Sequence, residues 1–207
     1  MTTVGGALAL TTVGGALVLL GAANGAPQFA PYQPLTAGMR WNYVCDGGIT
    51  ATRTITTGSI QSISGFLNTI TLNIAGQPSV QYGELETNDS QGTRIGGFTF
   101  PPTYPGLPIN PPQVELPINP VIGQSVQFPD GAGGTVTVTY QGFATLTVPA
   151  GTYTAGVFKE ADSNPQPPIP FPRVVYMVRG FGEVASQIAA FPAQNLPATT
   201  CQLQSSG

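Results

Sequence analysis

The N-terminal segment is the feature that most limits how this chain can fold. Its first 39 residues contain no charged side chain, and the first ionisable group is Arg40. The phrase Thr-Thr-Val-Gly-Gly-Ala-Leu occurs there twice, at residues 2–8 and 11–17, and the apolar run continues to Leu20. Because exposed apolar surface is unfavourable in water, such a segment is not expected to remain a solvated tail. It should be removed, enter a membrane or be buried in protein.

Each of these three outcomes has support in the sequence. Small residues at 21–26 follow the apolar run, as in the cleavage zone of a secretory signal peptide, although no basic residue precedes the run. Residues 4–22 are nearly long enough to cross a hydrocarbon core of roughly 30 Å as a helix, so membrane contact through them is a second alternative. Threonine, valine and leucine also suit a β-strand, which gains main-chain hydrogen bonds when it is donated to an open sheet.

We favour the donated strand, with residues 1–30 as an arm separate from the rest of the chain. The two copies of the repeat are offset by nine residues. Because nine is an odd number, the copies face opposite sides of an extended strand, which suits a segment buried on both faces. The side chains expected to make the buried contacts with a neighbouring subunit are Val4, Leu8, Leu10, Val13, Leu17 and Leu19.

Low charge narrows the class of protein further. Only 7% of the residues are charged, there is no histidine, and mean hydropathy is +0.13. Intrinsic disorder requires the opposite composition, and six scattered cations form no basic stripe for nucleic acid. The composition suits a protein whose surface is covered by copies of itself.

Two cysteines, Cys45 and Cys201, lie near the two ends of the region that is expected to fold. In an oxidising compartment they would form one disulfide, which the chain-entropy model credits with roughly 4–5 kcal/mol for so long a loop. Two buried free thiols are the alternative. The secreted character of the composition favours the disulfide.

From Arg40 onward the residue pattern is that of β-strands. Residues 135–140 read Thr-Val-Thr-Val-Thr-Tyr, and alternation of apolar and polar residues also marks 40–45, 49–57 and 70–74. Glycine and proline turns separate these runs, and no stretch outside the head shows a convincing helical stripe. We therefore predict an all-β fold, an antiparallel β-sandwich or an open curled sheet, in a single β domain over residues 31–207.

A proline-rich stretch interrupts this pattern over residues 101–120. The phrase Leu-Pro-Ile-Asn-Pro occurs twice, at 107–111 and 116–120. Proline removes hydrogen-bond donors and favours extended geometry. We predict a long Pro-rich loop at 101–120, with an arm that packs on a neighbouring subunit as the alternative.

The sequence offers little that would support catalysis. Without histidine there is no Ser-His-Asp or Cys-His machinery and no imidazole metal site. No phosphate-binding glycine motif is present; the glycine-rich stretch at 130–134 is expected to be a hairpin turn. We predict that the protein is not an enzyme and needs no metal or other cofactor.

Individual residues suggest roles in metal binding, core packing or glycosylation. Glu84, Glu86 and Asp89 could hold a hard cation through oxygen ligands, but an exposed acidic edge is the favoured interpretation. The acidic pair at 160 and 162 is expected in a solvated loop. Trp41 is expected in the core. Asn88 begins the only N-glycosylation sequon and is a possible modification site.

Three phrases resemble a loosely defined group of secreted or lipid-anchored bacterial β domains, mostly of unknown function. They are the stretches Pro-Leu-Thr-Ala-Gly-Met-Arg-Trp-Asn-Tyr at 34–43, Val-Pro-Ala-Gly-Thr-Tyr at 148–153, and Val-Tyr-Met-Val-Arg-Gly-Phe-Gly-Glu-Val at 175–184. The resemblance implies an all-β fold and an extracytoplasmic compartment, and it assigns no catalytic residue. The chain departs from the group in its uncharged head, its Pro-rich insertion, its cysteine pair and Phe181.

These observations lead to two hypotheses about function. The first is a structural subunit of an extracellular, pilus-like filament or surface assembly, whose partners are copies of itself and whose apolar head inserts into the next subunit. The second is a monomeric secreted or membrane-anchored envelope domain that binds an apolar ligand in its curled sheet. Both place the protein outside the cytoplasm, at the cell surface.

Overall fold

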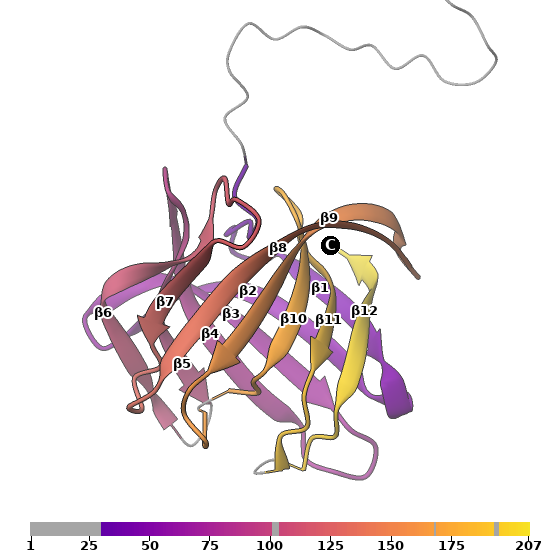
Figure 1. Cartoon of the computed structure of the whole chain (residues 1–207). Helices are drawn as coiled ribbons and strands as arrows, with labels where there is room; N and C mark the ends of the chain where they lie inside the picture. Colours follow the sequence, from indigo (N-terminus) through magenta and orange to yellow (C-terminus); the bar gives the residue numbers. More distant parts are fainter. Residues whose placement is uncertain (1–29, 101–103, 168, 193–194) are drawn as a thin grey trace, which may run out of the picture.

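The computed structural model of the chain describes residues 30–100, 104–167, 169–192 and 195–207 (Figure 1). A single antiparallel sheet of 12 strands makes up the described part. The strands are β1 (Arg40–Cys45), β2 (Thr50–Ile60), β3 (Ile63–Asn73), β4 (Val80–Asp89), β5 (Gly92–Phe100), β6 (Tyr104–Pro117), β7 (Ser125–Pro129), β8 (Thr135–Val148), β9 (Gly151–Asp162), β10 (Arg173–Val178), β11 (Gly182–Ile188) and β12 (Thr199–Ser206), with one short 3-10 turn, η1 (Asp46–Gly48).

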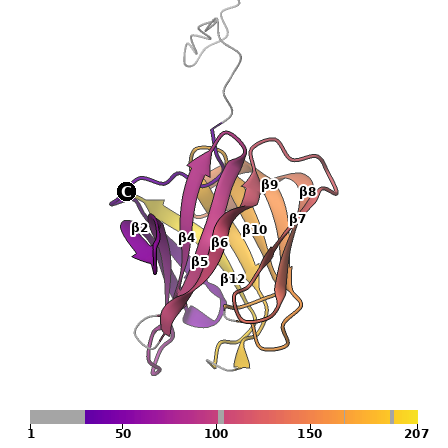
Figure 2. The ribbon, with the colours of Figure 1, turned by 90° about the vertical axis from the view of Figure 1, so that its left-hand side faces the viewer.

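The sheet follows the chain as a meander. Its order is β6-β5-β4-β3-β2-β1-β12-β11-β10-β9-β8-β7, so the pairing of β1 with β12 joins the two halves of the chain. The sheet curls until β1–β6 form one wall and β7–β12 the facing wall (Figure 1). The two end strands, β6 and β7, lie side by side (Figure 2). The all-β prediction is confirmed, and of its two alternatives the curled sheet is the one observed.

Alternating residues explain why these segments are strands and which face they bury. In β8 the side chains of Val136, Val138 and Tyr140 are buried inside, whereas the threonines between them face outward. The β-branched residues fit a pleated, half-buried surface. On the outer face, hydroxyls pair across strands, as between Ser125 Oγ and Thr139 Oγ1 at 2.8 Å. The inward side chains of these strands together form the interior of the curled sheet.

The Pro-rich stretch is a strand and not the predicted loop. β6 covers most of it, pairs with β5 through three register shifts, and is one of the two end strands of the sheet. Among the described residues no backbone pairing joins β6 to β7. An end strand needs ladder hydrogen bonds on one side only, so it tolerates prolines that a central strand would not. We name this interruption, where β6 lies beside β7 without a ladder, the β6/β7 seam.

The first described residues pack along one end of the sheet. Tyr32 is buried and its ring lies edge-on to Phe158, with ring centroids 4.9 Å apart. Gly156 makes room for it, because a Cβ there would lie 2.8 Å from the Tyr32 ring. The Gly180 amide donates to the Pro31 carbonyl at 2.8 Å. Residues 1–29, and with them nearly all of the predicted arm, lie outside the described residues.

The core fills the space between the two walls. Trp41 is 1% exposed and its indole nitrogen donates to the Phe181 carbonyl at 3.1 Å, which confirms its predicted place in the core.

The glycine-rich turn at 130–134 joins β7 to β8, as predicted. There the Asp130 carboxylate accepts the amide protons of Ala132 and Gly134, both at 2.7 Å.

Candidate functional site

Most of the chain's acidic side chains lie inside the curled sheet. Five of its nine acidic residues and two of its six basic residues are buried in one group, at most 6% exposed. This was not predicted: Glu84 and Glu86 were expected on an exposed edge, and Glu160 in a solvated loop. We call the group the interior charge cluster. Its members are Arg53, Glu84, Glu86, Glu115, Glu160, Arg173 and Glu183.

Strand alternation places these charges on the inner face. In β4, Glu84 and Glu86 continue the inward series that begins at Val80 and Tyr82. In β2, Arg53 takes the inward position between Ala51 and Ile55. The period of two was the available signal. This signal is weak by itself, because charged residues are almost never fully buried unless they are paired, and the partners come from distant strands.

Arg173 of β10 lies at the centre of the cluster. Its Nη2 atom is 2.5 Å from Glu84 Oε1 on the opposite wall and 3.9 Å from Glu115 Oε1 of β6. Its Nε atom donates to Glu160 Oε2, on the residue directly opposite in β9. One guanidinium therefore gathers carboxylates from three other strands.

A second ion pair also bridges the two walls. Arg53 Nη2 of β2 lies 2.5 Å from Glu183 Oε2 of β11, with both side chains 7% exposed. Glu86 has no such partner in the described chain. Its two carboxyl oxygens each accept from the Asn68 amide nitrogen at 3.2 Å. Buried pairs of this kind are costly to break, because the remaining charge is left without compensation.

Burial raises the pKa values of three carboxyls in the cluster. Burial, followed by the charge of Glu84, raises the pKa of the Glu86 carboxyl to about 8. The same two causes raise the pKa of Glu115 well above its usual range. The pKa of Glu160 is also raised by burial, with Arg173 opposing the shift. These groups hold their protons more tightly than exposed carboxyls do.

Unpartnered polar atoms mark a small hollow beside the cluster. Gln33 is fully buried, and neither its amide oxygen nor its amide nitrogen has a hydrogen-bond partner; Glu115 Oε2 also lacks one. These residues line a cavity of about 10 Å³. A neighbouring cavity of about 20 Å³ is lined by Tyr43, by Arg53, Arg173 and Glu183 of the cluster, and by mostly apolar side chains. Volumes of about 10–15 Å³ hold one water molecule, so water is the ligand that fits.

In the described part of the chain no group of three or more cysteine, aspartate or glutamate side chains is placed to hold a metal ion. The trio proposed for a hard cation is divided, since Glu84 and Glu86 lie inside while Asp89 lies outside, where it pairs with Arg94. What the arrangement offers chemically is a set of buried carboxyls that bind protons.

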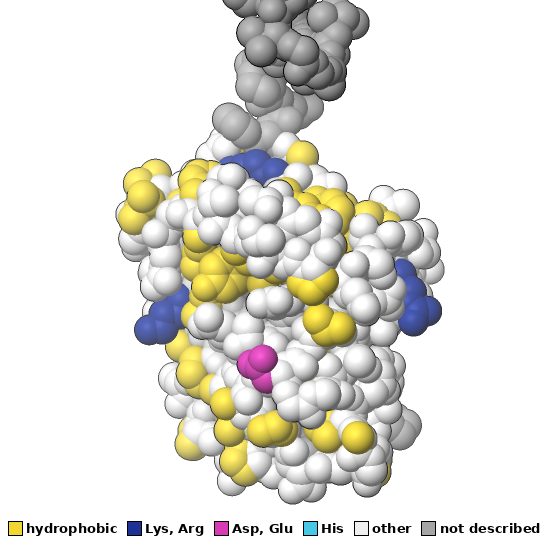
Figure 3. Space-filling view, turned by 90° about the vertical axis from the view of Figure 1, so that its right-hand side faces the viewer, with side chains coloured by type: hydrophobic (Ala, Val, Ile, Leu, Met, Phe, Trp, Pro, Cys, Tyr) yellow, Lys and Arg dark blue, Asp and Glu magenta, His cyan; other side chains and the backbone are white. Residues whose placement is uncertain are grey.

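The outer surface is left almost without charge. Asp130 is also buried, in the turn between β7 and β8. The charged side chains that remain outside are four basic and three acidic ones: Arg40, Arg94, Lys159, Arg179, Asp46, Asp89 and Asp162. Figure 3 shows one face of the molecule, on which charged groups form a few isolated spots among apolar and uncharged polar groups. Three large apolar side chains are strongly exposed, Val121 at 71%, Ile122 at 73% and Phe143 at 64%.

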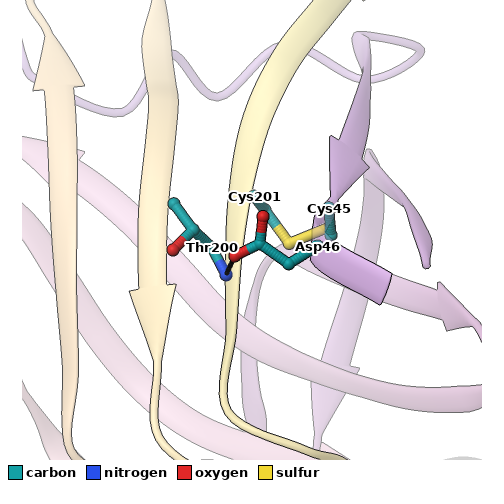
Figure 4. Close-up of a disulfide and its surroundings, with 4 residues drawn as sticks. All are labelled: Cys45, Asp46, Thr200 and Cys201. Carbon is teal, nitrogen blue, oxygen red and sulfur yellow. Dashed lines mark hydrogen bonds between the residues drawn. A yellow bond between two sulfur atoms is a disulfide. The ribbon is translucent and has the colours of Figure 1, made fainter. Parts of the chain in front are cut away.

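The predicted disulfide is present. Cys45 of β1 and Cys201 of β12 face each other in register and are bonded (Figure 4). Beside the bond, Asp46 accepts the Thr200 amide proton at 3.0 Å (Figure 4). The bridge thus ties the first strand along the chain to the last, at the pairing that joins the two halves of the chain.

The remaining predicted residues have different outcomes. Val4, Leu8, Leu10, Val13, Leu17 and Leu19 lie outside the described residues. Asn88 lies near the exposed end of β4. Its side-chain amide nitrogen, which glycosylation would modify, donates to the backbone carbonyl of Gln33 at 2.9 Å. Its oxygen accepts from Thr93 at 2.9 Å. Asn88 glycosylation stays an untested prediction.

Comparisons with known proteins give little beyond this description. No protein-family model and no curated protein matches the chain. Two solved structures align with 86% of it and 99% of their own chains, both at 12% identity: a provisionally described exported protein with a YmcC-like fold from Bacteroides fragilis, with a TM-score of 0.42, and a provisionally described lipoprotein from Parabacteroides distasonis, with a TM-score of 0.40. Similarity this distant carries no inference about function.

In the described part of the chain, no helix is long and apolar enough to span a membrane.

Proposed function

We propose that this chain is an exported structural protein, a subunit of an extracellular filament or surface assembly, and not an enzyme. Its apolar N-terminal segment would insert into a neighbouring subunit, so that copies of the chain are its partners. Contacts of this head-to-tail kind generate open fibres when the rotation between subunits does not close. The nearly uncharged outer surface is the observation that carries the proposal.

The distribution of charge supports assembly. A net charge far from zero keeps proteins soluble and monomeric through repulsion. Here five acidic groups are buried inside, and the seven charges that remain outside are of mixed sign. Little repulsion therefore opposes the approach of a second copy.

An exposed apolar patch lies next to the β6/β7 seam. Val121 and Ile122 belong to the connection between β6 and β7, and Phe143 follows the bulge at Gly142 in β8. A Cβ on Gly142 would lie 3.3 Å from Ile122 Cδ1, so this glycine lets the connection pack against β8. Unpaired strand edges are templates for pairing with another chain, and we propose the seam as the place where a donated head pairs.

The filled interior weighs against the alternative of an apolar ligand. Cavities for drug-sized ligands are about 300–1,000 Å³, whereas the cavity at Gln33 and Glu115 and its neighbour are about 10 and 20 Å³. A hollow of about 300 Å³ does lie at Lys159, Val174 and Gln187, but it is open to solvent. Charged and aromatic side chains occupy the space that an apolar ligand would need.

The disulfide supports export. Disulfides persist in oxidising compartments and are rare in the cytosol. The bond between Cys45 and Cys201 ties β1 to β12. We therefore propose an extracellular or cell-surface location.

Charge introduced into the head tests the proposal. We expect Leu8→Asp or Leu17→Asp to abolish assembly while leaving the domain folded, because a buried carboxylate without a partner is strongly unfavourable. Electron microscopy and sedimentation measure assembly, and circular dichroism measures folding. Thr152→Asp is the matched control, because it adds the same charge to an exposed position of β9. Normal filaments from both leucine variants would refute head insertion.

A further inference from the structure

The interior charge cluster contains more carboxyl groups than its guanidinium groups can neutralise. Five glutamates face two arginines, and all seven residues are at most 6% exposed. An isolated charge in so apolar an environment is expensive, and such a group neutralises itself when it can. Three carboxyl groups are in surplus, which is the observation that the proposed assembly does not explain.

We infer that this cluster is a proton-binding site in which Glu86 and Glu115 are held as neutral carboxylic acids, and that folding of the domain takes up two protons from neutral solution. The inference does not depend on assembly and concerns the domain itself.

Geometry selects these two residues. Glu84 and Glu183 each have a guanidinium nitrogen at 2.5 Å, and Glu160 accepts from Arg173 Nε. The guanidinium nearest to Glu115 is 3.9 Å away, and Glu86 is held only by the neutral amide of Asn68. The two guanidinium groups are thus already engaged by other carboxylates.

The unpartnered atoms are consistent with protonated acids. Gln33 and Glu115 line the same small cavity, and both have polar atoms without a partner. A protonated carboxyl is a donor as well as an acceptor. One water molecule in the cavity, together with an acidic proton on Glu115, would supply the donor that the side-chain amide oxygen of Gln33 lacks. An ionised Glu115 would add only acceptors.

Every strand that faces the two acids contributes to their environment. Arg53 and Arg173 favour the ionised form of Glu86, and Arg173 favours that of Glu115. Burial and the charge of Glu84 oppose ionisation of both acids and prevail. The charge of Glu160 also opposes ionisation of Glu115. The titratable and charged groups of the surrounding strands are Tyr43 of β1, Arg53 of β2, Tyr82 and Glu84 of β4, Glu160 of β9, Arg173 of β10 and Glu183 of β11.

The sign of the pH dependence follows from the raised pKa values. An unfolded glutamate has a pKa of about 4.3, whereas folded Glu86 has one of about 8. Stability is therefore greatest below the unfolded pKa and is lost as pH rises through the folded pKa. The chain has no histidine, so no other ordinary side chain titrates between pH 5.5 and 7.5. In this window the unfolding equilibrium constant should rise about tenfold for each unit of increase in pH and for each proton that the folded state binds.

Proton release on unfolding tests the inference directly. The full chain is unfolded with denaturant at pH 6.5 in weak buffer while the released protons are titrated. We expect two protons per chain, one for Glu86→Gln or Glu115→Gln, and none for the double variant. Asp89→Asn, which removes an exposed carboxyl with a lowered pKa, should leave two. The unfolding constant should rise about 100-fold per pH unit in the natural chain.

Other outcomes would overturn the inference. Release of no proton, or an unfolding constant that does not change between pH 5.5 and 7.5, would mean that the acids are ionised in the folded state. Stabilisation by added calcium or sodium chloride that Glu115→Gln abolishes would assign the cavity to a cation instead. If a glutamine variant does not fold, the pH dependence of the natural chain still decides the question.

Discussion

Replacing Arg173 with methionine is expected to lower the free energy of unfolding by about 3–5 kcal/mol at pH 7, because it removes one partner of a buried ion pair. Arg173 contacts Glu84 and Glu160 and is the nearest guanidinium to Glu115. Methionine retains much of the apolar volume, so the loss reports mainly on charge. Urea unfolding measures it. The loss should be smaller at pH 4.5, where the stranded carboxylates take up protons at lower cost.

Arg94→Met is the matched control for this variant. Arg94 pairs with Asp89 at the surface, where their side chains are 26% and 40% exposed. Exposed pairs contribute about 0–1 kcal/mol. A loss for Arg173→Met no greater than that of Arg94→Met would contradict a central role for Arg173 in the cluster.

Removing the disulfide is the second change with a large expected effect. The bond between Cys45 and Cys201 closes a loop with a sequence separation of 156. The chain-entropy model gives a loss of about 5 kcal/mol when both cysteines are replaced by alanine. Because the bond also fixes β1 against β12, the change acts at the pairing that joins the two halves of the sheet.

Denaturant unfolding of the double alanine variant measures this loss. The natural chain in reducing buffer serves as the comparison, because it lacks the bond but keeps both side chains. The two should show similar losses. A change below about 1 kcal/mol in both would mean that the unfolded chain is not restricted by the bond in the way that the loop length predicts.

Local pattern made the strands predictable. The alternation of valine and threonine in residues 135–140, the core position of Trp41 and the disulfide all followed from features within a few residues or from composition. The proline-rich strand β6 did not. Whether a strand tolerates proline depends on whether it lies at an end of the sheet, and that position is fixed by the topology of the whole chain.

The interior charge cluster was missed for a related reason. Strand alternation alone would have placed Glu84, Glu86 and Arg53 on the inner face. A buried charge is acceptable only with a partner, and the partners lie far along the chain: Arg173 is 89 residues from Glu84, and Glu183 is 130 residues from Arg53. Nothing local in the sequence indicates such pairs.

The cluster and the outer surface together describe one arrangement of charge. Acidic groups are concentrated inside, where they bind arginines and protons, and the outside is left to hydroxyls, amides and apolar side chains. We therefore expect the domain to stay folded at low pH and to associate with other copies of itself. The six apolar residues of the head, from Val4 to Leu19, remain predictions for the contact between subunits.

Negative-stain electron microscopy of the native material, followed by N-terminal sequencing of its subunits, tests the proposed function most directly. The account predicts uniform fibres whose subunits retain the apolar head, with a sequence that begins at Met1 or Thr2. Dispersed particles whose chains begin near Ala26 would contradict it, because the head would then have served only as a signal for export.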